Sequence, residues 1–210
     1  MTTTIIFDYN GIIVDDLEVH LQAFLELGRK YNSKTTEEEL RAIFHTPTKD
    51  KILLMFPNSS EEFIKNMLNE KEDIYIEKAT KTDVFFPGTK ETILKLAENH
   101  TLAIISNTTK KQLLPVLGDL GKFFTNIMTY EDIPKPKPAP DSLLKTMEIL
   151  NKKPEECCYV GDAPSDMKAA KNSNILAIGI PTGFNSKKEL LEAGADKIIN
   201  NIKELPEVLD

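Results

Sequence analysis

The chain has 210 residues, of which 40% are hydrophobic, so it can bury one substantial core, or one core and a small inserted unit. Its formal net charge of -7 argues against a nucleic-acid partner, because phosphate backbones are bound through clustered Lys and Arg side chains. A small anionic substrate stays compatible with an acidic protein, since one site can be locally positive. We therefore expect a globular protein that binds no nucleic acid.

Cysteine usage and the N-terminal residues indicate a reducing compartment. The only two cysteines, Cys157 and Cys158, are neighbours in an apolar run, which argues against a disulfide framework and offers no metal-binding spacing. The first residues, Met-Thr-Thr-Thr, lead into a strand without a basic segment, and no apolar run approaches the roughly 18 residues that cross a bilayer. We expect a cytoplasmic protein with no membrane contact, as a monomer or a small homo-oligomer.

The first predicted strand covers residues 5–7 and ends at a carboxylate. Its three bulky apolar residues are typical of a buried parallel strand, and Asp8 follows directly. Gly11 then lets the backbone turn back sharply. Open α/β sheets bind ligands outside the carboxyl ends of their strands, so Asp8 stands where chemistry is expected. A lone Asp can also simply cap a turn after a strand; the matching residues downstream favour the functional interpretation.

Residues 15–85 predict an all-α unit inserted after the first strand, which we expect to be a cap. Apolar residues recur at three-and-four spacing, and hydroxyl residues precede acidic ones at two helix starts. The expected helices run from Leu17 to Gly28, from about Thr35, from Lys49 to Phe56, and from Ser59 toward Lys81. Residues 1–14 and 86–210 then form the core domain.

From residue 86 onward, short apolar runs alternate with amphipathic ones. The expected strands cover residues 102–105, 126–129, 157–160, 175–180 and 197–199, and the expected helices cover residues 89–99, 110–117, 141–150 and 165–171, with a short helix after residue 203. This alternation implies a parallel sheet with right-handed crossovers and helices on both faces. The predicted fold class is α/β, a doubly wound parallel sheet with an inserted helical cap.

Three predicted strands end in polar residues that can meet at one edge of the sheet. Asp8 closes the first, residues 106–108 (Ser-Asn-Thr) follow the second, and Asp162 follows the strand that begins at Cys157. Residues 135–140, Lys-Pro-Lys-Pro-Ala-Pro, form a rigid loop that carries lysine. Mg2+ prefers carboxylate, phosphate and water oxygens as ligands. The sequence therefore predicts a phosphate held with a divalent cation at this edge.

With these residues the chain resembles the haloacid dehalogenase superfamily of phosphohydrolases, in the capped branch that includes phosphoglycolate phosphatase and β-phosphoglucomutase. Four motifs occur in family order over nearly the whole chain. The first is matched by Asp8, Gly11, Asp15 and His20, with Asn10 as a departure; the second by Ser106, followed by Asn107; the third by Lys137; and the fourth by Gly161, Asp162 and Asp166. Lys135 also fits the third motif, but Pro138, Pro140 and Asp141 favour Lys137.

The resemblance implies a role for each matching residue. Asp8 would attack phosphorus and form an aspartyl-phosphate, while Ser106 and Lys137 would hold the transferring phosphoryl oxygens. Mg2+ would be bound by Asp8, Asp162 and the backbone carbonyl of Asn10, with Asp166 reached through water. Structural alternatives stay open for three residues: Asp166 could cap or pair on its own helix, Lys135 could be solvated, and Thr108 is expected to be a helix N-cap.

Asn10 departs from the family pattern, which has an Asp at this position. In the family that Asp protonates the leaving oxygen and then activates water, and Asn can do neither. Such a group typically contributes a factor of about 100 to 10,000 in rate. Metal binding should survive, because residue 10 would act through its carbonyl. A weakly active natural protein, a substrate with a good leaving group and an engineered substitution are all consistent with Asn10.

The cap is expected to select the substrate. Residues 44–50 join two cap helices where relatives carry a specificity loop. His45, Lys49, His20 and, beside the second motif, Asn107 complete the expected substrate-binding residues. Alternatively, residues 44–50 form a solvated loop, and His20 packs at the hinge.

These observations predict a Mg2+-dependent phosphohydrolase of a small phosphorylated metabolite. A sugar-phosphate mutase is one alternative, but it needs an acid and base at residue 10 even more than a hydrolase does. A phospho-ligand binding protein that has lost turnover is the other alternative. The sequence leaves the identity of the substrate open.

Overall fold

The computed structural model describes residues 2–209 and divides the chain into two compact units. The α/β unit comprises Met1–Asp15 and Phe85–Asp210, and the helical unit comprises Asp16–Val84. The predicted division, with the insert at residues 15–85, differs from this one by a single residue at each junction.

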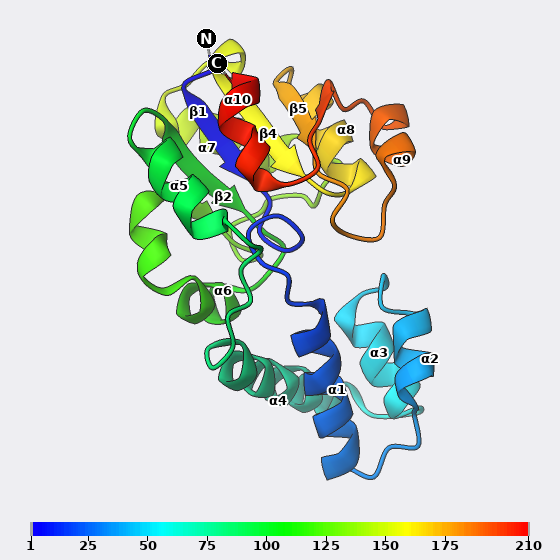
Figure 1. Cartoon of the computed structure of the whole chain (residues 1–210). Helices are drawn as coiled ribbons and strands as arrows, with labels where there is room; N and C mark the ends of the chain where they lie inside the picture. The colour runs from blue at the N-terminus through cyan, green and yellow to red at the C-terminus, as the bar shows by residue number, and fades with distance from the viewer. Residues whose placement is uncertain (1, 210) are drawn as a thin grey trace. The chain divides into compact units, whose positions relative to one another are not determined.

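The α/β unit is built on a six-stranded sheet in the order β3-β2-β1-β4-β5-β6, and every neighbouring pair is parallel (Figure 1). The strands are β1 (Thr4–Phe7), β2 (Thr101–Ile105), β3 (Asn126–Met128), β4 (Cys157–Gly161), β5 (Leu176–Gly179) and β6 (Lys197–Ile198). The chain winds outward from β1 to β3, then returns to place β4 on the other side of β1. The winding direction therefore reverses between β1 and β4, which is where open α/β sheets bind their ligands.

Helices cover both faces of this sheet. They are α5 (Thr89–Ala97), α6 (Lys110–Leu117), α7 (Asp141–Leu150), α8 (Pro164–Asn172), α9 (Lys187–Glu192) and α10 (Leu205–Leu209), with 3-10 turns η1 (Gly118–Phe123), η2 (Pro154–Glu156) and η3 (Ile202–Glu204). Figure 1 shows α5 and α10 on one face and α7 and α8 on the other. All residues of β1 and β4 are buried, as expected for strands covered on both faces.

The core of the α/β unit lies between the sheet and its helices. One large cluster contains Ile6, Ala103, Ile105, Met128, Leu143, Met147, Cys157, Tyr159, Met167, Ala169, Ala170, Ile175, Ala177 and Leu190. Cys157 belongs to this core, and both it and Cys158 are buried free thiols. Burial raises the pKa of Cys157 to about 11 and that of Cys158 further still, so both are protonated and unreactive at neutral pH.

The helical unit contains α1 (Leu17–Lys30), α2 (Glu37–Ala42), α3 (Thr48–Met55) and α4 (Glu61–Ala79), and no strand lies within residues 16–84. Two predicted helix starts are confirmed by their caps. Thr36 and Glu39 form a capping box at α2, and the Ser60 hydroxyl accepts the Phe63 N–H at α4. The apolar faces meet in a second core of Leu21, Phe24, Leu27, Leu40, Ile52, Met55, Ile64 and Met67.

The predicted fold class is thus confirmed, a doubly wound α/β unit with an inserted helical unit. The α-helix missed from the sequence is α9, although Ser186 and Glu189 form a capping box at its start, and the 3-10 turns η1 and η2 were not predicted either. Among residues 2–209, none of the helices has the length and the apolar content to span a membrane.

Candidate active site

Three adjacent strands bring polar residues to one edge of the sheet. Asp8 follows β1, Ser106 follows β2 and Asp162 follows β4. The Asp8 N–H donates to the backbone oxygen of Val160 at 2.8 Å, which extends the pairing of β1 with β4 up to the site. The predicted convergence at the carboxyl ends of these strands is what the structure shows.

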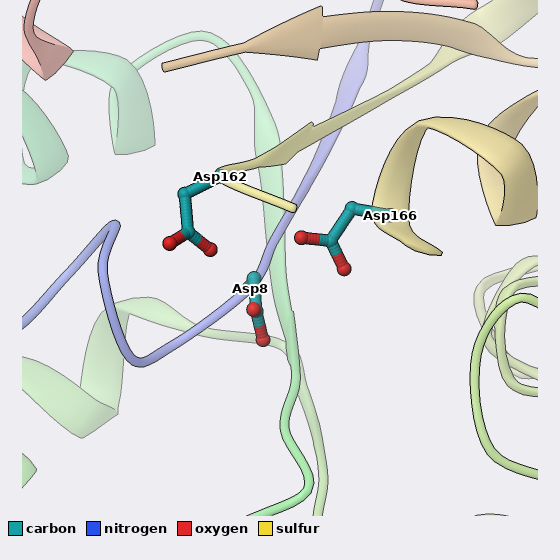
Figure 2. Close-up of side chains that lie close together, drawn as sticks. All are labelled: Asp8, Asp162 and Asp166. Atoms are coloured by element: carbon teal, nitrogen blue, oxygen red, sulfur yellow. The ribbon is translucent and has the colours of Figure 1, made fainter. Parts of the chain in front are cut away.

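Three carboxylates gather there, from Asp8, Asp162 and Asp166 (Figure 2). One oxygen from each lies within 4.8 Å of the other two. Asp166 lies in the first turn of α8, where its Oδ2 accepts the Ala163 N–H at 3.0 Å. It therefore caps its helix, as the structural alternative predicted, and also faces the other carboxylates.

Glycines make room for Asp162. Gly11 has φ +77°, and a Cβ placed on it would lie 2.5 Å from Asp162 Oδ2. A side chain at Gly183 would also collide with this carboxylate. The loop that carries Gly11 is linked to the segment that follows β5, because Thr182 Oγ1 donates to the Gly11 carbonyl. Gly11 thus serves both a left-handed turn and the close approach of its backbone to a carboxylate.

Lys137 offsets part of the negative charge of the three carboxylates. Its Nζ lies 3.1 Å from Asp8 Oδ1 and 2.6 Å from Asp166 Oδ1, and its side chain is only 5% exposed. It also donates to the Tyr159 hydroxyl at 3.0 Å. Burial alone would lower the pKa of this lysine, but Asp166 and Asp8 outweigh that effect and hold the pKa well above its usual value. Lys135, the other candidate, is 71% exposed and pairs with Asp141 at 3.5 Å.

A single ammonium leaves this group of three carboxylates short of positive charge. Burial, reinforced by Asp8 and Asp166, raises the pKa of Asp162 to about 8. Burial also raises the pKa of Asp8 to about 6, although Lys137 opposes the shift. A divalent cation would relieve this repulsion, and an all-oxygen donor set is the kind that Mg2+ prefers. The residues present therefore fit Mg2+.

The loop after β2 provides the Ser106 hydroxyl and contacts Asn10, the residue that departs from the family pattern. Ser106 is buried, and its Oγ accepts the Thr108 N–H at 3.0 Å, whereas Asn107 is exposed. The prediction of Thr108 as a helix N-cap is wrong: Thr109 caps α6 by accepting the Gln112 N–H at 3.3 Å. Thr108 instead donates its hydroxyl to Asn10 Oδ1 at 2.6 Å. Its side chain faces the site rather than the helix because it lies one residue before the true cap.

Three expected substrate-binding residues lie in the helical unit. His20 is engaged at both ring nitrogens, with Nε2 at 3.2 Å from Asp16 Oδ2 and Nδ1 against Lys71 Nζ. Burial, followed by Lys71, lowers the pKa of His20. Lys49 is exposed and pairs with Glu61 at 3.0 Å, and His45 is exposed. Substrate binding by these three residues stays a prediction.

Tyr159 is the residue that sequence reasoning missed. It lies in the middle of β4 and is fully buried, and its hydroxyl contacts Lys137 at 3.0 Å and Asp166 at 3.5 Å. With Asp8 and Asp166 it supplies an acceptor for the third N–H of the ammonium group. In the sequence Tyr159 is one more apolar residue of a buried strand, so only its position three residues before Asp162 hinted at the site.

Comparisons with known proteins agree with this arrangement. The family model described as haloacid dehalogenase-like hydrolase matches residues 5–180. A phosphorylated carbohydrates phosphatase of Thermotoga maritima is 28% identical over 216 residues, covering 96% of this chain and 98% of the relative. A phosphoglycolate phosphatase of Pseudomonas syringae is 28% identical over 220 residues, covering 98% of this chain and 79% of the relative.

Two solved structures share the fold of this chain. A Thermotoga maritima protein provisionally assigned as a β-phosphoglucomutase superposes with a TM-score of 0.85 and 25% identity, covering all 100% of this chain and 98% of that one. The CbbY protein of Rhodobacter sphaeroides, solved with phosphate, superposes with a TM-score of 0.83 at 21% identity, covering 98% and 96% of the two chains. The second likeness concerns the fold alone.

Proposed function

The chain belongs to the haloacid dehalogenase-like hydrolase family, and from that premise we propose that it is a Mg2+-dependent phosphatase of small phosphorylated metabolites. The observation that carries the proposal is the convergence of Asp8, Asp162 and Asp166 with the Lys137 ammonium at the edge where the sheet reverses its winding. The names of the relatives, which include phosphatases of phosphorylated carbohydrates and of phosphoglycolate, support substrates of this size.

Asp8 is the nucleophile in this proposal. Its Oδ1 is held by the Tyr9 N–H at 2.9 Å and by Lys137 at 3.1 Å, which leaves the other oxygen to attack phosphorus. The attack forms an aspartyl-phosphate and breaks the bond between phosphorus and the leaving oxygen, which departs with its electron pair and takes a proton from water according to its own pKa. Water then hydrolyses the acyl phosphate to regenerate Asp8. Splitting the transfer in this way replaces one difficult step by two easier ones.

The remaining residues stabilise the negative charge of the transferring phosphoryl group. Lys137 lies between Asp8 and Asp166, so it can offset the negative charge of the transferring group, and Ser106 offers a buried hydroxyl to a phosphoryl oxygen. The carboxylates of Asp8 and Asp162 and the backbone carbonyl of Asn10 would hold Mg2+, with Asp166 reached through water. When bound, Mg2+ would stabilise the charge on the phosphoryl oxygens and neutralise the carboxylates that face them.

Asn10 supports a second candidate, a phospho-ligand binding protein with little turnover. An amide cannot donate or accept a proton in catalysis, so the same site could bind a phosphate ester and release it unchanged. The mutase alternative is less well supported, because it requires proton transfer at residue 10 in both directions.

Turnover of an aryl phosphate with Mg2+ tests the proposal. We expect hydrolysis by the native chain and its loss in Asp8→Asn, which keeps the shape of the side chain but removes the nucleophilic oxygen. Asp119→Asn, an exposed position on η1, is the matched control and should retain the native rate. Native-like turnover in Asp8→Asn would exclude the assigned nucleophile. Phosphate-ester binding without turnover in the native chain would favour the binding protein.

A further inference from the structure

A cavity of about 210 Å3 lies in the α/β unit next to the loop that carries Gly11. Its walls are mainly apolar and come from Ile12, Phe86, Ile180 and Ile202. Ile12 directly follows Gly11 in the chain, and Ile202 begins η3. None of the three carboxylates of the candidate active site lines this cavity. It is therefore a second concave site, separate from the carboxylates at the edge of the sheet.

The volume and the walls of this cavity fit an aromatic ring. A dry cavity of about 150 Å3 between Leu, Ile and Phe side chains is large enough to bind benzene. The larger cavity in this chain has room for such a ring and one small polar group. Phe86 adds an aromatic face to the aliphatic walls, and aromatic pairs gain stability beyond the area that they bury. A purely apolar ligand would leave the charged part of the lining without a partner.

Lys203 supplies the charge of the lining. Among residues 2–209 it is the one charged side chain that lines the cavity. Its methylene stem lies against Gly88, since a Cβ placed on Gly88 would be 2.1 Å from Lys203 Cε and 2.8 Å from Lys203 Cγ. Gly88 is the N-cap of α5 and has no side chain with which to cap this helix. The ammonium, one bond beyond Cε, is therefore close to the first turn of α5.

Positive charge at this place lacks compensation. The N-terminus of a helix carries a partial positive charge, so a lysine beside it is unfavourable unless an anion joins it. Neither Glu91, in the first turn of α5, nor any other carboxylate of residues 2–209 forms an ion pair with Lys203. Glu204 instead accepts hydrogen bonds from the side chains of Asn200 and Asn201, at 3.1 Å and 3.0 Å. An anion in the cavity would meet both the ammonium and the positive end of α5.

We propose that this cavity binds an aromatic carboxylate of about the size of benzoate, with the ring between the apolar walls and the carboxylate on the Lys203 ammonium at the start of α5. The proposal goes beyond the phosphatase function and does not depend on it. A bound ring would contact Ile12 and Thr182, which both line the cavity. The Thr182 hydroxyl donates to the Gly11 carbonyl, and Gly11 faces Asp162, so the ligand would also stabilise the turn beside the carboxylates.

Titration of the whole native chain with benzoate, followed by NMR, tests the binding. The backbone amide signals of Ile12, Thr182 and Ile202 should shift with a common Kd of roughly 1 mM, the affinity expected for a ligand of about nine non-hydrogen atoms. Benzamide has the same shape without the charge, so it should bind about five-fold more weakly. Benzamide that binds as tightly as benzoate would overturn the proposal, and so would benzoate that shifts none of these signals.

Lys203→Met makes the matching change in the protein. The methionine keeps an apolar stem over Gly88 and removes the charge, so benzoate should bind about five-fold more weakly while the affinity for benzamide stays the same. Lys95→Met, at an exposed position near the other end of α5, is the matched control and should keep the native affinity for both probes. Equal affinity of benzoate for the native chain and for Lys203→Met would overturn the proposal.

A cavity-filling variant locates the bound probe. Ile202→Phe places a larger side chain in the cavity and should abolish the binding of both benzoate and benzamide. Its unfolding transition shows whether the variant is folded, and Lys203→Met decides the question if it is not. Benzoate bound at the candidate active site would instead shift the signals of Asp8 and Ser106 and would keep its Kd in a folded Ile202→Phe variant, which would overturn the proposal.

Discussion

Individual carboxylates at the sheet edge differ in how their charge is compensated. Lys137 contacts Asp8 and Asp166, whereas Asp162 has no ion pair with a side chain among those found in residues 2–209, and burial raises its pKa to about 8. Asp162 is therefore the carboxylate that should gain most from a bound cation. Removing its charge should weaken Mg2+ binding more than it harms the fold.

We predict that Asp162→Asn weakens the affinity for Mg2+ at least ~10-fold, which is the scale of the effect seen when groups around a bound metal are removed. The measurement is the Mg2+ concentration that gives half-maximal activity, together with the Mg2+-dependent rise in melting temperature. Asp119→Asn should leave both quantities unchanged. A variant with native Mg2+ dependence in both measurements would contradict the assignment of Asp162 as a ligand.

Asn10 makes a second prediction at this scale. Asn10→Asp restores an acid, so it should raise the rate on alkyl phosphates by ~100-fold or more, with much less gain on acyl phosphates, whose leaving groups need no proton. Parallel rate measurements on the two ester classes test it.

Spontaneous deamidation must be measured in the same preparation. Asn10 precedes Gly11, a pair in which deamidation to Asp is favoured, and converted molecules would add activity to the native sample. Mass spectrometry of the peptide containing Asn10 gives the converted fraction. With a negligible fraction, an Asn10→Asp variant that gains nothing on any alkyl phosphate would show that the residue does not limit the rate.

Site residues were readable from the strand pattern where they directly follow strand ends, whereas Lys137 and Asp166 do not and were chosen through the family resemblance. Asp8, Ser106 and Asp162 each stand directly after an apolar run, and a parallel sheet brings such positions together. Thr108 contacts Asn10 and Tyr159 contacts Lys137, each from a distant segment of the chain. No local sequence pattern therefore predicts these contacts. Pairing of this kind is a property of tertiary packing.

At the scale of elements, helices with strong caps and long apolar stripes were predicted well. α2 and α4 begin where hydroxyl residues precede acidic ones, and both caps are formed. The missed helix, α9, matches α2 in having six residues, one buried side chain and a capping box. The difference lies in the first turn, where α9 has Lys187 and Lys188 in place of the acidic residues that marked the start of α2.

Helix α3 supports a prediction about substrate choice. Lys49 is expected to contact the substrate, but in the structure it pairs with Glu61 across exposed positions, and such pairs contribute little to stability. Lys49→Ala should therefore raise KM for the physiological substrate while leaving the turnover of small generic esters unchanged. Steady-state kinetics on both classes, after a screen of phosphorylated metabolites, provide the test.

Glu61→Ala is the matched variant for this experiment. It breaks the same ion pair but leaves the Lys49 charge available, so KM should stay the same or fall. Equal increases in KM for Lys49→Ala and Glu61→Ala would indicate a structural effect of the lost pair. Equal losses on generic and physiological esters would likewise exclude a selective role for Lys49.

For the molecule as a whole, the buried charges fall into two groups, one in each unit. The α/β unit buries Asp166, whereas the helical unit buries Asp16 together with Lys51 and Lys71, which are 3% and 2% exposed. The groups around Lys71 are His20 at its amine, the rings of Phe24 and Tyr75, and the charges of Asp16, Lys51 and Glu72. Burial lowers the pKa of Lys71 to about 7, although Asp16 opposes the shift.

This lowered pKa makes the stability of the protein depend on pH in a definite direction. In the unfolded chain Lys71 keeps its proton up to a pKa of about 10.4, whereas in the folded protein it has lost the proton above about 7. Between these values Lys71 binds more protons in the unfolded state, so its contribution to the free energy of unfolding rises with pH, whereas Cys157 and Cys158, whose pKa values are raised by burial, contribute with the opposite sign. The rise should be on the order of 1 kcal/mol per pH unit from this residue. Lys51, with a pKa lowered by burial to about 8, acts in the same direction.

We predict that Lys71→Met reduces the slope of the free energy of unfolding against pH between about pH 9 and 10, a window in which Asp162, with its pKa raised to about 8, is largely ionised and the contributions of Cys157 and Cys158 are the same in both proteins. Urea unfolding at constant ionic strength, followed by circular dichroism, measures it. The methionine keeps the length of the side chain without a titratable group, and Lys51 preserves part of the slope. Lys65→Met, at an exposed position on the same helix α4, should leave the slope unchanged. Identical pH dependence in the native protein and in Lys71→Met would mean that Lys71 stays protonated when folded, and that Asp16 compensates its burial in full.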